Sequence, residues 1–193
     1  GEAPTLKQQG RTLEISSEQG TASTIRVGAF HPYLCYEAEF SALATNNEAG
    51  VIFYPNSGEG RSVRVVYRNG EILSLASEGG NDKQLASKQI GTQQALKLRI
   101  QYTGVRFHVF HLHENGEAEL LYSVENDMRS VDSCITHSFG IYTNLSADSS
   151  VTLHKAESAL TCGTGQADPQ IIQNTDGTPL IRDGRLYLCF TTR

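Results

Sequence analysis

The stretch LKLRIQY, from Leu96 to Tyr102, decides the fold of this chain. Its apolar residues alternate with Lys97, Arg99 and Gln101, so an extended strand here has one apolar and one polar face. A shift of the pairing register by one residue would bury the polar side chains, which fixes the register. The stretch therefore predicts a half-buried β-strand with a core side and a solvent side.

The same alternation, broken by Gly, Asn and Asp, runs from Arg11 to Glu157, and helical spacing is hardly present. The segment Tyr33–Leu43 shows the same alternation of residues between a core face and an opposite face. Further strands are predicted at Thr12–Ser16, Ser23–Val27, Gly50–Tyr54, Lys83–Ser87, Phe139–Asn144 and Ser150–Ala156. Many short antiparallel strands between turns favour an all-β, two-sheet sandwich over a parallel sheet.

Two Asn-Gly pairs predict tight β-hairpin turns. Asn69-Gly70 separates Val63–Tyr67 from Ile72–Leu75. Asn115-Gly116 separates Phe107–His113 from Glu117–Val124. In both pairs Asn and Gly tolerate the positive φ angles that such a turn requires.

Composition excludes several classes of partner. The 193 residues, of 21.1 kDa, carry a net charge of −5, with Lys and Arg scattered along the chain. Nucleic acid is not expected as a partner, because phosphate binding needs a concentrated basic face. No apolar run is long enough to span a bilayer. Arg64, Arg68 and Lys97 are expected to guard exposed strand edges.

The four cysteines have no zinc-binding or redox spacing. Cys35, Cys134, Cys162 and Cys189 lie far apart, with no Cys-x-x-Cys pair. We expect packed free thiols, since the alternating segments around Cys35 and Cys189 suit a small buried side chain. One disulfide is the alternative, which secretion would favour.

Four segments together resemble the concanavalin A-like, or laminin G-like, jelly roll. They are Tyr36–Phe40, Ala49–Tyr54, Leu98–Gly104 and Phe139–Asn144, the last a Phe-Gly-Ile strand of the kind that closes the sheet in that family. The resemblance implies a concanavalin A-like sandwich over residues 1–160. It rests on core pattern, so it implies a fold more than an activity.

Residues 161–193 have a sequence pattern that differs from that of the preceding residues. They are expected to form a linker and the first strands of a second domain. Ala167-Asp168-Pro169 precedes Ile171-Ile172, and a second apolar strand follows around Asp183-Gly184. This pattern resembles the opening of the first blade in five-bladed propeller glycoside hydrolases such as family 43. The resemblance implies a propeller domain that lies mostly beyond the present sequence.

In that family an Asp before Pro at this position is the general base, so the resemblance implies this role for Asp168 in a parent enzyme. The general acid would lie in later blades, so this chain alone is expected to be inactive. The alternative is structural: Asp168 begins a turn, and Pro169 lies at a strand edge.

The predicted sandwich has no visible catalytic motif. Jelly-roll glycanases of the laminarinase type carry Glu-x-Asp-x-x-Glu on one strand, and this motif is absent. Glu37 with Glu39, and Glu117 with Glu119, share strand faces without an intervening Asp. We expect all four to be solvated residues of the outer face.

Tyrosines are the candidates for sugar binding, because pyranose CH groups stack on aromatic rings and the chain has no Trp. Tyr33, Tyr54 and Tyr142 are assigned as candidate ligand-binding residues because they lie near predicted strand ends. The alternative is that they are core or rim residues of the sandwich.

No metal ligands are assigned. His111 and His113 share a strand face, with Glu114 beside them, but no third ligand of matching spacing is visible. No cofactor is expected either, apart from calcium at an unknown site. Asp127, Asp132 and Asp148 are scattered candidates for calcium ligands.

The leading functional hypothesis is a non-catalytic accessory module of a secreted, periplasmic or cell-surface glycan-degrading enzyme. Its partners would be carbohydrate or a propeller domain of the same polypeptide. The alternative is a free-standing carbohydrate-binding or adhesion module. A third hypothesis, a jelly-roll hydrolase or lyase with an unfamiliar site, requires activity in the isolated chain.

Overall fold

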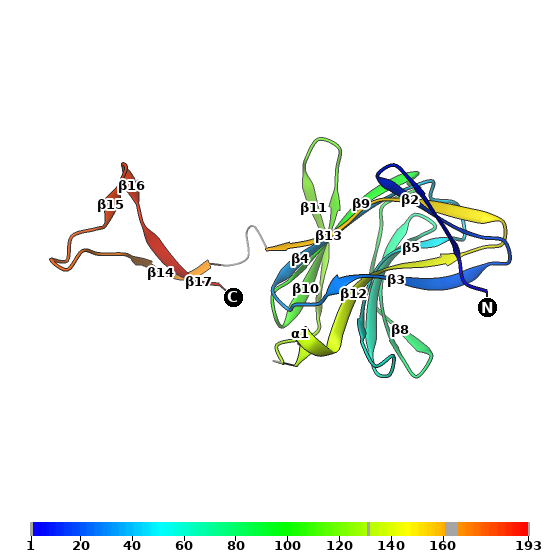
Figure 1. Cartoon of the computed structure of the whole chain (residues 1–193), viewed down its shortest axis with the longest axis horizontal. Helices are drawn as coiled ribbons and strands as arrows, with labels where there is room; N and C mark the ends of the chain where they lie inside the picture. Colours follow the sequence, from blue (N-terminus) through cyan, green and yellow to red (C-terminus); the bar gives the residue numbers. More distant parts are fainter. Residues whose placement is uncertain (1, 131, 161–165, 193) are drawn as a thin grey trace. The chain divides into compact units, whose positions relative to one another are not determined.

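The computed structural model describes residues 2–130, 132–160 and 166–192. Its chain forms two compact units, which divide between Leu160 and Thr161. The first unit is a sandwich of two large antiparallel sheets (Figure 1). The prediction of an all-β, two-sheet jelly-roll sandwich is confirmed.

One sheet has seven strands in the order β1-β2-β13-β4-β9-β10-β11. Their bounds are Thr5–Gln9 for β1, Thr12–Ser17 for β2, Ser149–Leu160 for β13, Leu34–Ser41 for β4, Ala95–Tyr102 for β9, Arg106–Leu112 for β10 and Ala118–Glu125 for β11. β1 is not among the strands predicted from the sequence. All of its residues are exposed, so it has no buried face to impose an apolar alternation.

The other sheet has six strands in the order β3-β12-β5-β6-β7-β8. Their bounds are Thr21–Ala29 for β3, His137–Leu145 for β12, Glu48–Pro55 for β5, Ser62–Arg68 for β6, Glu71–Glu78 for β7 and Asn81–Gln89 for β8. The six short strand segments predicted from alternation each lie within one of the observed strands.

Helix is almost absent from the part of the chain that the structure describes. It is limited to α1, a single turn at Ser133–Thr136. Among these described residues there is accordingly no helix with the length and apolar character needed to cross a membrane.

The two Asn-Gly pairs form different turns. Asn69 and Gly70 both have positive φ, 50° and 83°, and connect the paired residues Arg68 and Glu71, as predicted. At the second pair only Gly116 has positive φ, 86°. The His113 N–H donates to the Glu117 carbonyl at 2.8 Å, so this loop has one residue more than the tight turn expected.

Aromatic rings join the two sheets in the core. Tyr36 of β4 and Tyr102 of β9 contact Phe53 of β5, with ring centroids 4.9 and 5.1 Å apart. Phe30, after β3, contacts Tyr102 at 4.9 Å, and Phe139 of β12 contacts Tyr36 at 4.8 Å. Rings from opposite sheets therefore interlock.

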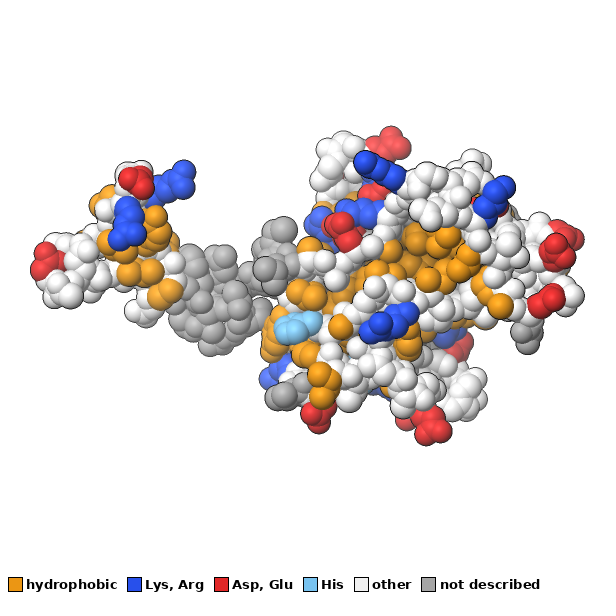
Figure 2. Space-filling view, viewed as in Figure 1, with side chains coloured by type: hydrophobic (Ala, Val, Ile, Leu, Met, Phe, Trp, Pro, Cys, Tyr) orange, Lys and Arg blue, Asp and Glu red, His pale blue; other side chains and the backbone are white. Residues whose placement is uncertain are grey.

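The predicted alternation of the first stretch holds in β9. Leu96, Leu98, Ile100 and Tyr102 are at most 1% exposed and lie in the core. Their strand lies between β4 and β10 in the seven-stranded sheet. In the space-filling view, hydrophobic side chains form a band across the sandwich unit, at the position of β13 and β3 in Figure 1 (Figure 2).

The second unit consists of short paired strands. β14, Gln166–Ile171, pairs with β17, Leu188–Thr192, and β15, Ile181–Arg182, pairs with β16, Arg185–Leu186. The predicted Asp183-Gly184 turn forms, with φ of 53° and 71°. Asp168 lies in β14, but its side chain is outside the described residues.

The cysteines only partly follow the expectation of packed thiols. Cys35 and Cys134 are half-buried, whereas Cys189 is an exposed free thiol, so the prediction for Cys189 is wrong. Its Sγ contacts the Gln170 carbonyl at 3.7 Å. The small hairpin around Cys189 has too little structure of its own to bury it. Cys162 is outside the described residues.

Gly50 of β5 is predicted to be irreplaceable, because a Cβ there would lie 2.0 Å from the Val65 carbonyl oxygen and 2.7 Å from the Val66 Cα. These are backbone atoms of β6, which cannot move without disturbing the sheet. We expect Gly50→Ala to lower the free energy of unfolding by at least about 2 kcal/mol, measured by urea denaturation.

Gly28 of β3 provides the matched control, since a Cβ there would meet nothing within 4 Å. Gly28→Ala is expected to change the free energy of unfolding by no more than about 0.5 kcal/mol. Equal unfolding midpoints for the two variants would show that β6 does not approach β5 as closely as described.

Candidate functional site

The outer face of the six-stranded sheet carries two arginine–carboxylate pairs near two of the candidate tyrosines. On β6, Val63, Val65 and Tyr67 point into the core. Successive residues of a strand point to opposite faces. Arg64, Val66 and Arg68 therefore point outward.

An apolar cluster lies at the centre of this outer face. Val66, Leu73 and Leu75 are at most 7% exposed, and Tyr142 of β12 packs against them. In the pairing register, Gly50 lies between Tyr142 and Val66. Because Gly50 has no side chain, the Tyr142 ring can contact the cluster across β5.

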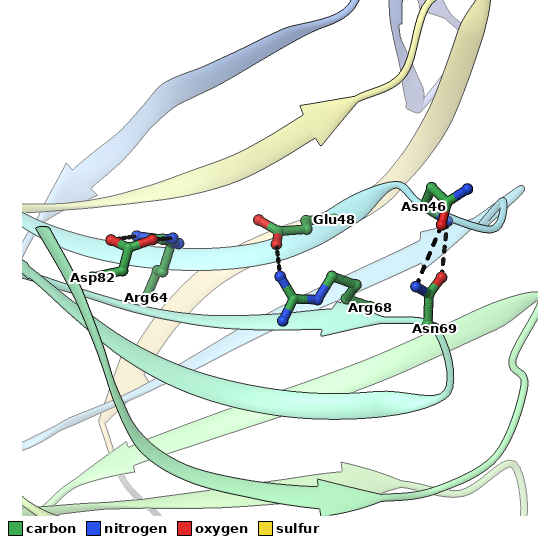
Figure 3. Close-up of polar contacts among 6 residues, drawn as sticks. All are labelled: Asn46, Glu48, Arg64, Arg68, Asn69 and Asp82. Atoms are coloured by element: carbon green, nitrogen blue, oxygen red, sulfur yellow. Dashed lines mark hydrogen bonds and ion pairs between the residues drawn. The ribbon is translucent and has the colours of Figure 1, made fainter. Parts of the chain in front are cut away.

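Arg64 is held by both an aromatic ring and a carboxylate. Its guanidinium carbon lies 5.0 Å from the centroid of the Tyr142 ring. Its two terminal nitrogens donate to the two carboxylate oxygens of Asp82 on β8, one at 3.0 Å (Figure 3). The Arg64 side chain is 10% exposed and that of Asp82 is 47% exposed, so the pair reaches solvent through Asp82.

One donor of Arg64 has no partner. Its Nε is buried and makes no hydrogen bond among the residues that the structure describes. A buried unsatisfied N–H costs free energy, and this nitrogen is shielded from solvent, so the part of the pair that a ligand can reach is the half-exposed carboxylate of Asp82.

Two further polar pairs follow along the same strands. Arg68 donates to Glu48 of β5 at 2.8 Å, and the Glu48 side chain is only 6% exposed. Beyond it, the Asn46 N–H donates to the Asn69 side-chain oxygen at 2.8 Å. Figure 3 shows the three pairs lying one after another. The outer face thus offers a row of fixed hydrogen-bonding groups.

The charges on this face shift the pKa values of their neighbours. Hydrogen bonding to Arg64 holds the pKa of Asp82 below its ordinary value. Burial raises the pKa of Tyr142, although the nearby Arg64 opposes this change. At neutral pH the face therefore presents a carboxylate beside a protonated phenol.

The prediction that Arg64, Arg68 and Lys97 guard exposed strand edges is wrong. Arg64 and Arg68 lie on β6, between β5 and β7, and Lys97 lies on β9, between β4 and β10. None of these strands is a sheet edge. Two of the charges that sequence reasoning assigned to edge protection are instead the cations of the outer face.

The structure brings two of the three candidate tyrosines to the same face. Tyr54 alternates with the core residue Phe53 on β5, so it points outward like Tyr142, and its ring lies beside Gly140. Tyr33 lies elsewhere. It is 39% exposed, and its ring is next to Gly104 in the connection between β9 and β10.

The glutamate pairs are not all solvated outer-face residues. Glu37 is on the outer face of its sheet, but its side chain is only 15% exposed and forms ion pairs with Arg99 and Lys155. Glu119 is opposite His111 in the β10–β11 ladder, on the face that includes the core residue Val109. The predicted outer-face position of Glu119 is therefore wrong.

The three candidate calcium ligands are not brought together among the described residues. The carboxylate of Asp127 is held by Arg129 at 2.7 Å. Asp132 precedes α1, and Asp148 lies in the turn between β12 and β13 with a φ of 51°. None of them belongs to the cluster of potential metal ligands found in the described part of the chain.

Comparison with known proteins shows the fold. No protein-family model and no curated protein sequence matches the chain. Among solved structures, the carbohydrate binding module CBM66 from Bacillus subtilis is similar with a TM-score of 0.62 and 12% identity, over 80% of this chain and 91% of that module. A legume lectin-like domain from Entamoeba histolytica has a TM-score of 0.60 and 11% identity, over 83% of this chain and 89% of that one.

A longer protein contains a similar sandwich. The bifunctional GH43-CE protein from Bacteroides eggerthii matches with a TM-score of 0.58 and 8% identity, over 80% of this chain but only 23% of its own. At these identities the comparisons show a shared jelly-roll fold.

The pairing of Asp82 with Arg64 is predicted to stabilise the fold in a pH-dependent way. The folded-state pKa of Asp82 is below its unfolded value of about 3.9, so its contribution is present above that value and lost as pH falls through the folded pKa. At pH 7, Asp82→Asn should cost about 1 kcal/mol, because solvent reaches the half-exposed carboxylate and weakens the pair.

Urea denaturation at several pH values between 7 and 3 checks this prediction. The difference between wild type and Asp82→Asn should shrink below about pH 3.9. Glu78→Gln, at an exposed position, is the control and should show little difference at any pH. A difference for Asp82→Asn that does not depend on pH would contradict the role of the ionised pair.

Proposed function

We propose that this chain is a non-catalytic carbohydrate-binding module that binds sugar on the outer face of its six-stranded sheet. One observation carries the proposal. On this face the Tyr142 ring lies against Arg64, which is paired with Asp82, and a second arginine–carboxylate pair, Arg68–Glu48, lies on the same strand.

The chemistry of this face suits a sugar. Vicinal hydroxyl groups of a sugar both donate and accept hydrogen bonds, so they can bind to guanidinium and carboxylate groups at once. The half-exposed side chains of Asp82 and Arg68 are the acceptor and the donor that a sugar can reach on this face. The rings of Tyr54 and Tyr142 supply apolar surface for the CH groups of the sugar.

The fold supports the same proposal by analogy. The sandwich spans nearly the whole of the CBM66 module and of the legume lectin-like domain, both named as carbohydrate-binding or lectin-like proteins. A shared fold does not carry a function by itself, so the residues of the outer face carry the argument.

We further propose that the module belongs to a secreted, periplasmic or cell-surface glycan-degrading enzyme with a propeller domain. The match occupies only part of the GH43-CE chain, which agrees with an accessory role. Apolar side chains of the second unit are exposed, among them Ile171, Ile181 and Leu186, and such residues are usually covered by further structure. In this enzyme Asp168 would be the general base.

A free-standing carbohydrate-binding or adhesion module is the alternative, and the outer face suits it equally well. It differs in requiring no enzyme in the same polypeptide.

Sugar binding is predicted to depend on the outer face. Affinity electrophoresis in gels that contain arabinan, xylan or sialylated glycans should show retardation of the wild-type chain by at least one of them. Tyr142→Ala and Asp82→Ala should each weaken binding about tenfold or more, because loss of a central contact costs at least about 1.4 kcal/mol.

Tyr33→Ala is the matched control, since it removes an exposed tyrosine outside this face and should leave the retardation unchanged. Circular dichroism of each variant verifies folding. Equal retardation of all variants would place the sugar elsewhere. Hydrolysis of a glycan by the isolated chain would instead support the jelly-roll hydrolase hypothesis.

The parent enzyme is tested by the intact mass of the native gene product. We expect it to exceed 21.1 kDa by about 30 kDa or more, which corresponds to at least one further domain of ordinary size. A native mass equal to that of this chain would exclude the propeller enzyme and leave the free-standing module.

A further inference from the structure

The end of the β10–β11 hairpin gathers three potential metal ligands. His111 lies near the end of β10, and His113 is the first residue after that strand; their ring centroids are 4.4 Å apart. Glu119 is directly opposite His111 in the ladder. One ligand atom from each of the three residues lies within 4.8 Å of the others.

The hairpin holds these residues in a defined arrangement. Its loop is closed by the His113 N–H donating to the Glu117 carbonyl at 2.8 Å. The Glu117 N–H in turn donates to the Asn115 side-chain oxygen at 2.9 Å. His111 and Glu119 are therefore held by paired strands, and His113 is held by the backbone hydrogen bond that closes the loop, so the ligands need little further ordering.

The site is closed on one side and open on the other. His111 is 8% exposed, whereas the side chains of His113 and Glu119 are 38% and 47% exposed. Both histidines line a pocket of about 480 Å³ next to the start of β9. An ion held here would keep an open coordination position.

From these observations we propose that His111, His113 and Glu119 bind a divalent transition metal ion of the Zn²⁺ type. Two imidazoles and one carboxylate form a ligand set that zinc uses when a fourth position is left for water or another molecule. Calcium and magnesium prefer oxygen ligands throughout, so this set selects against them.

The ligands need a small movement to close on the ion. Zinc bonds of about 2.0–2.1 Å in a tetrahedron place the ligand atoms about 3.4 Å apart. The His113 Nε2 and the Glu119 Oε2 are already 2.9 Å apart. A rotation of the exposed Glu119 side chain would admit the ion between them.

The carboxylate of Glu119 lies beside both histidine rings, opposite His111 in the ladder and in contact with His113. The His113–Glu119 contact places a negative charge beside the second ring, which a cation would share.

The test is a titration of the untagged, chelator-treated full chain with Zn²⁺ by calorimetry and with Co²⁺ by visible absorption. We expect one ion per chain and Co²⁺ bands that Zn²⁺ abolishes by displacement. His113→Gln and Glu119→Gln should each weaken the affinity for Zn²⁺ at least about tenfold. Mutation of a residue that only hydrogen-bonds a metal ligand already lowers metal affinity by about that factor.

His108→Gln is the matched control. His108 lies on the same strand but on the opposite face, where it contacts Ser123 at 2.7 Å. This variant should bind Zn²⁺ as the wild type does. The proposal is overturned if wild type shows no saturable binding, if the two ligand variants bind equally well, or if the control loses binding to the same extent.

Discussion

The interlocking of aromatic rings between the two sheets is the interaction on which the rest of this structure depends. Tyr36 and Tyr102 from one sheet pack against Phe53 and Phe139 from the other. The hydroxyl groups of the two tyrosines have hydrogen-bond partners. The Tyr36 hydroxyl donates to the His31 carbonyl, and the Tyr102 hydroxyl accepts from the Asn126 side chain. Once these rings fix which side of each strand is inside, the period of two assigns every alternate residue to the outer face.

Two consequences of this assignment lie on different surfaces. On the six-stranded sheet it places Arg64 and Arg68 outward, where carboxylates from β5 and β8 neutralise them. On the other sheet, the same assignment makes His111 point inward near the end of β10, beyond the last core residue of that strand. The proposed sugar and metal sites thus share a fold but no residues, and each can exist without the other.

Structural features that depend on local sequence pattern were predictable, whereas contacts that depend on the register between strands were not. The LKLRIQY stretch and the Asn69-Gly70 turn were predictable because one face or one turn type determines them. A tight turn at Asn115-Gly116 would have paired Leu112 with Glu119, whereas the longer loop pairs His111 with Glu119. Likewise, Arg64 meets Asp82 across β7, where the β7–β8 register shifts after Ser74. Neither pairing can be read from spacing alone.

The position of β12 and β13 governs how the sandwich can be completed during synthesis. β12 lies between β3 and β5, and β13 lies between β2 and β4. Until residues 137–160 have left the ribosome, each sheet consists of two separate pieces with unpaired edges. Such edges invite association between nascent chains. The sandwich therefore closes late and through contacts between distant parts of the chain, which makes its folding slow compared with that of a simple meander.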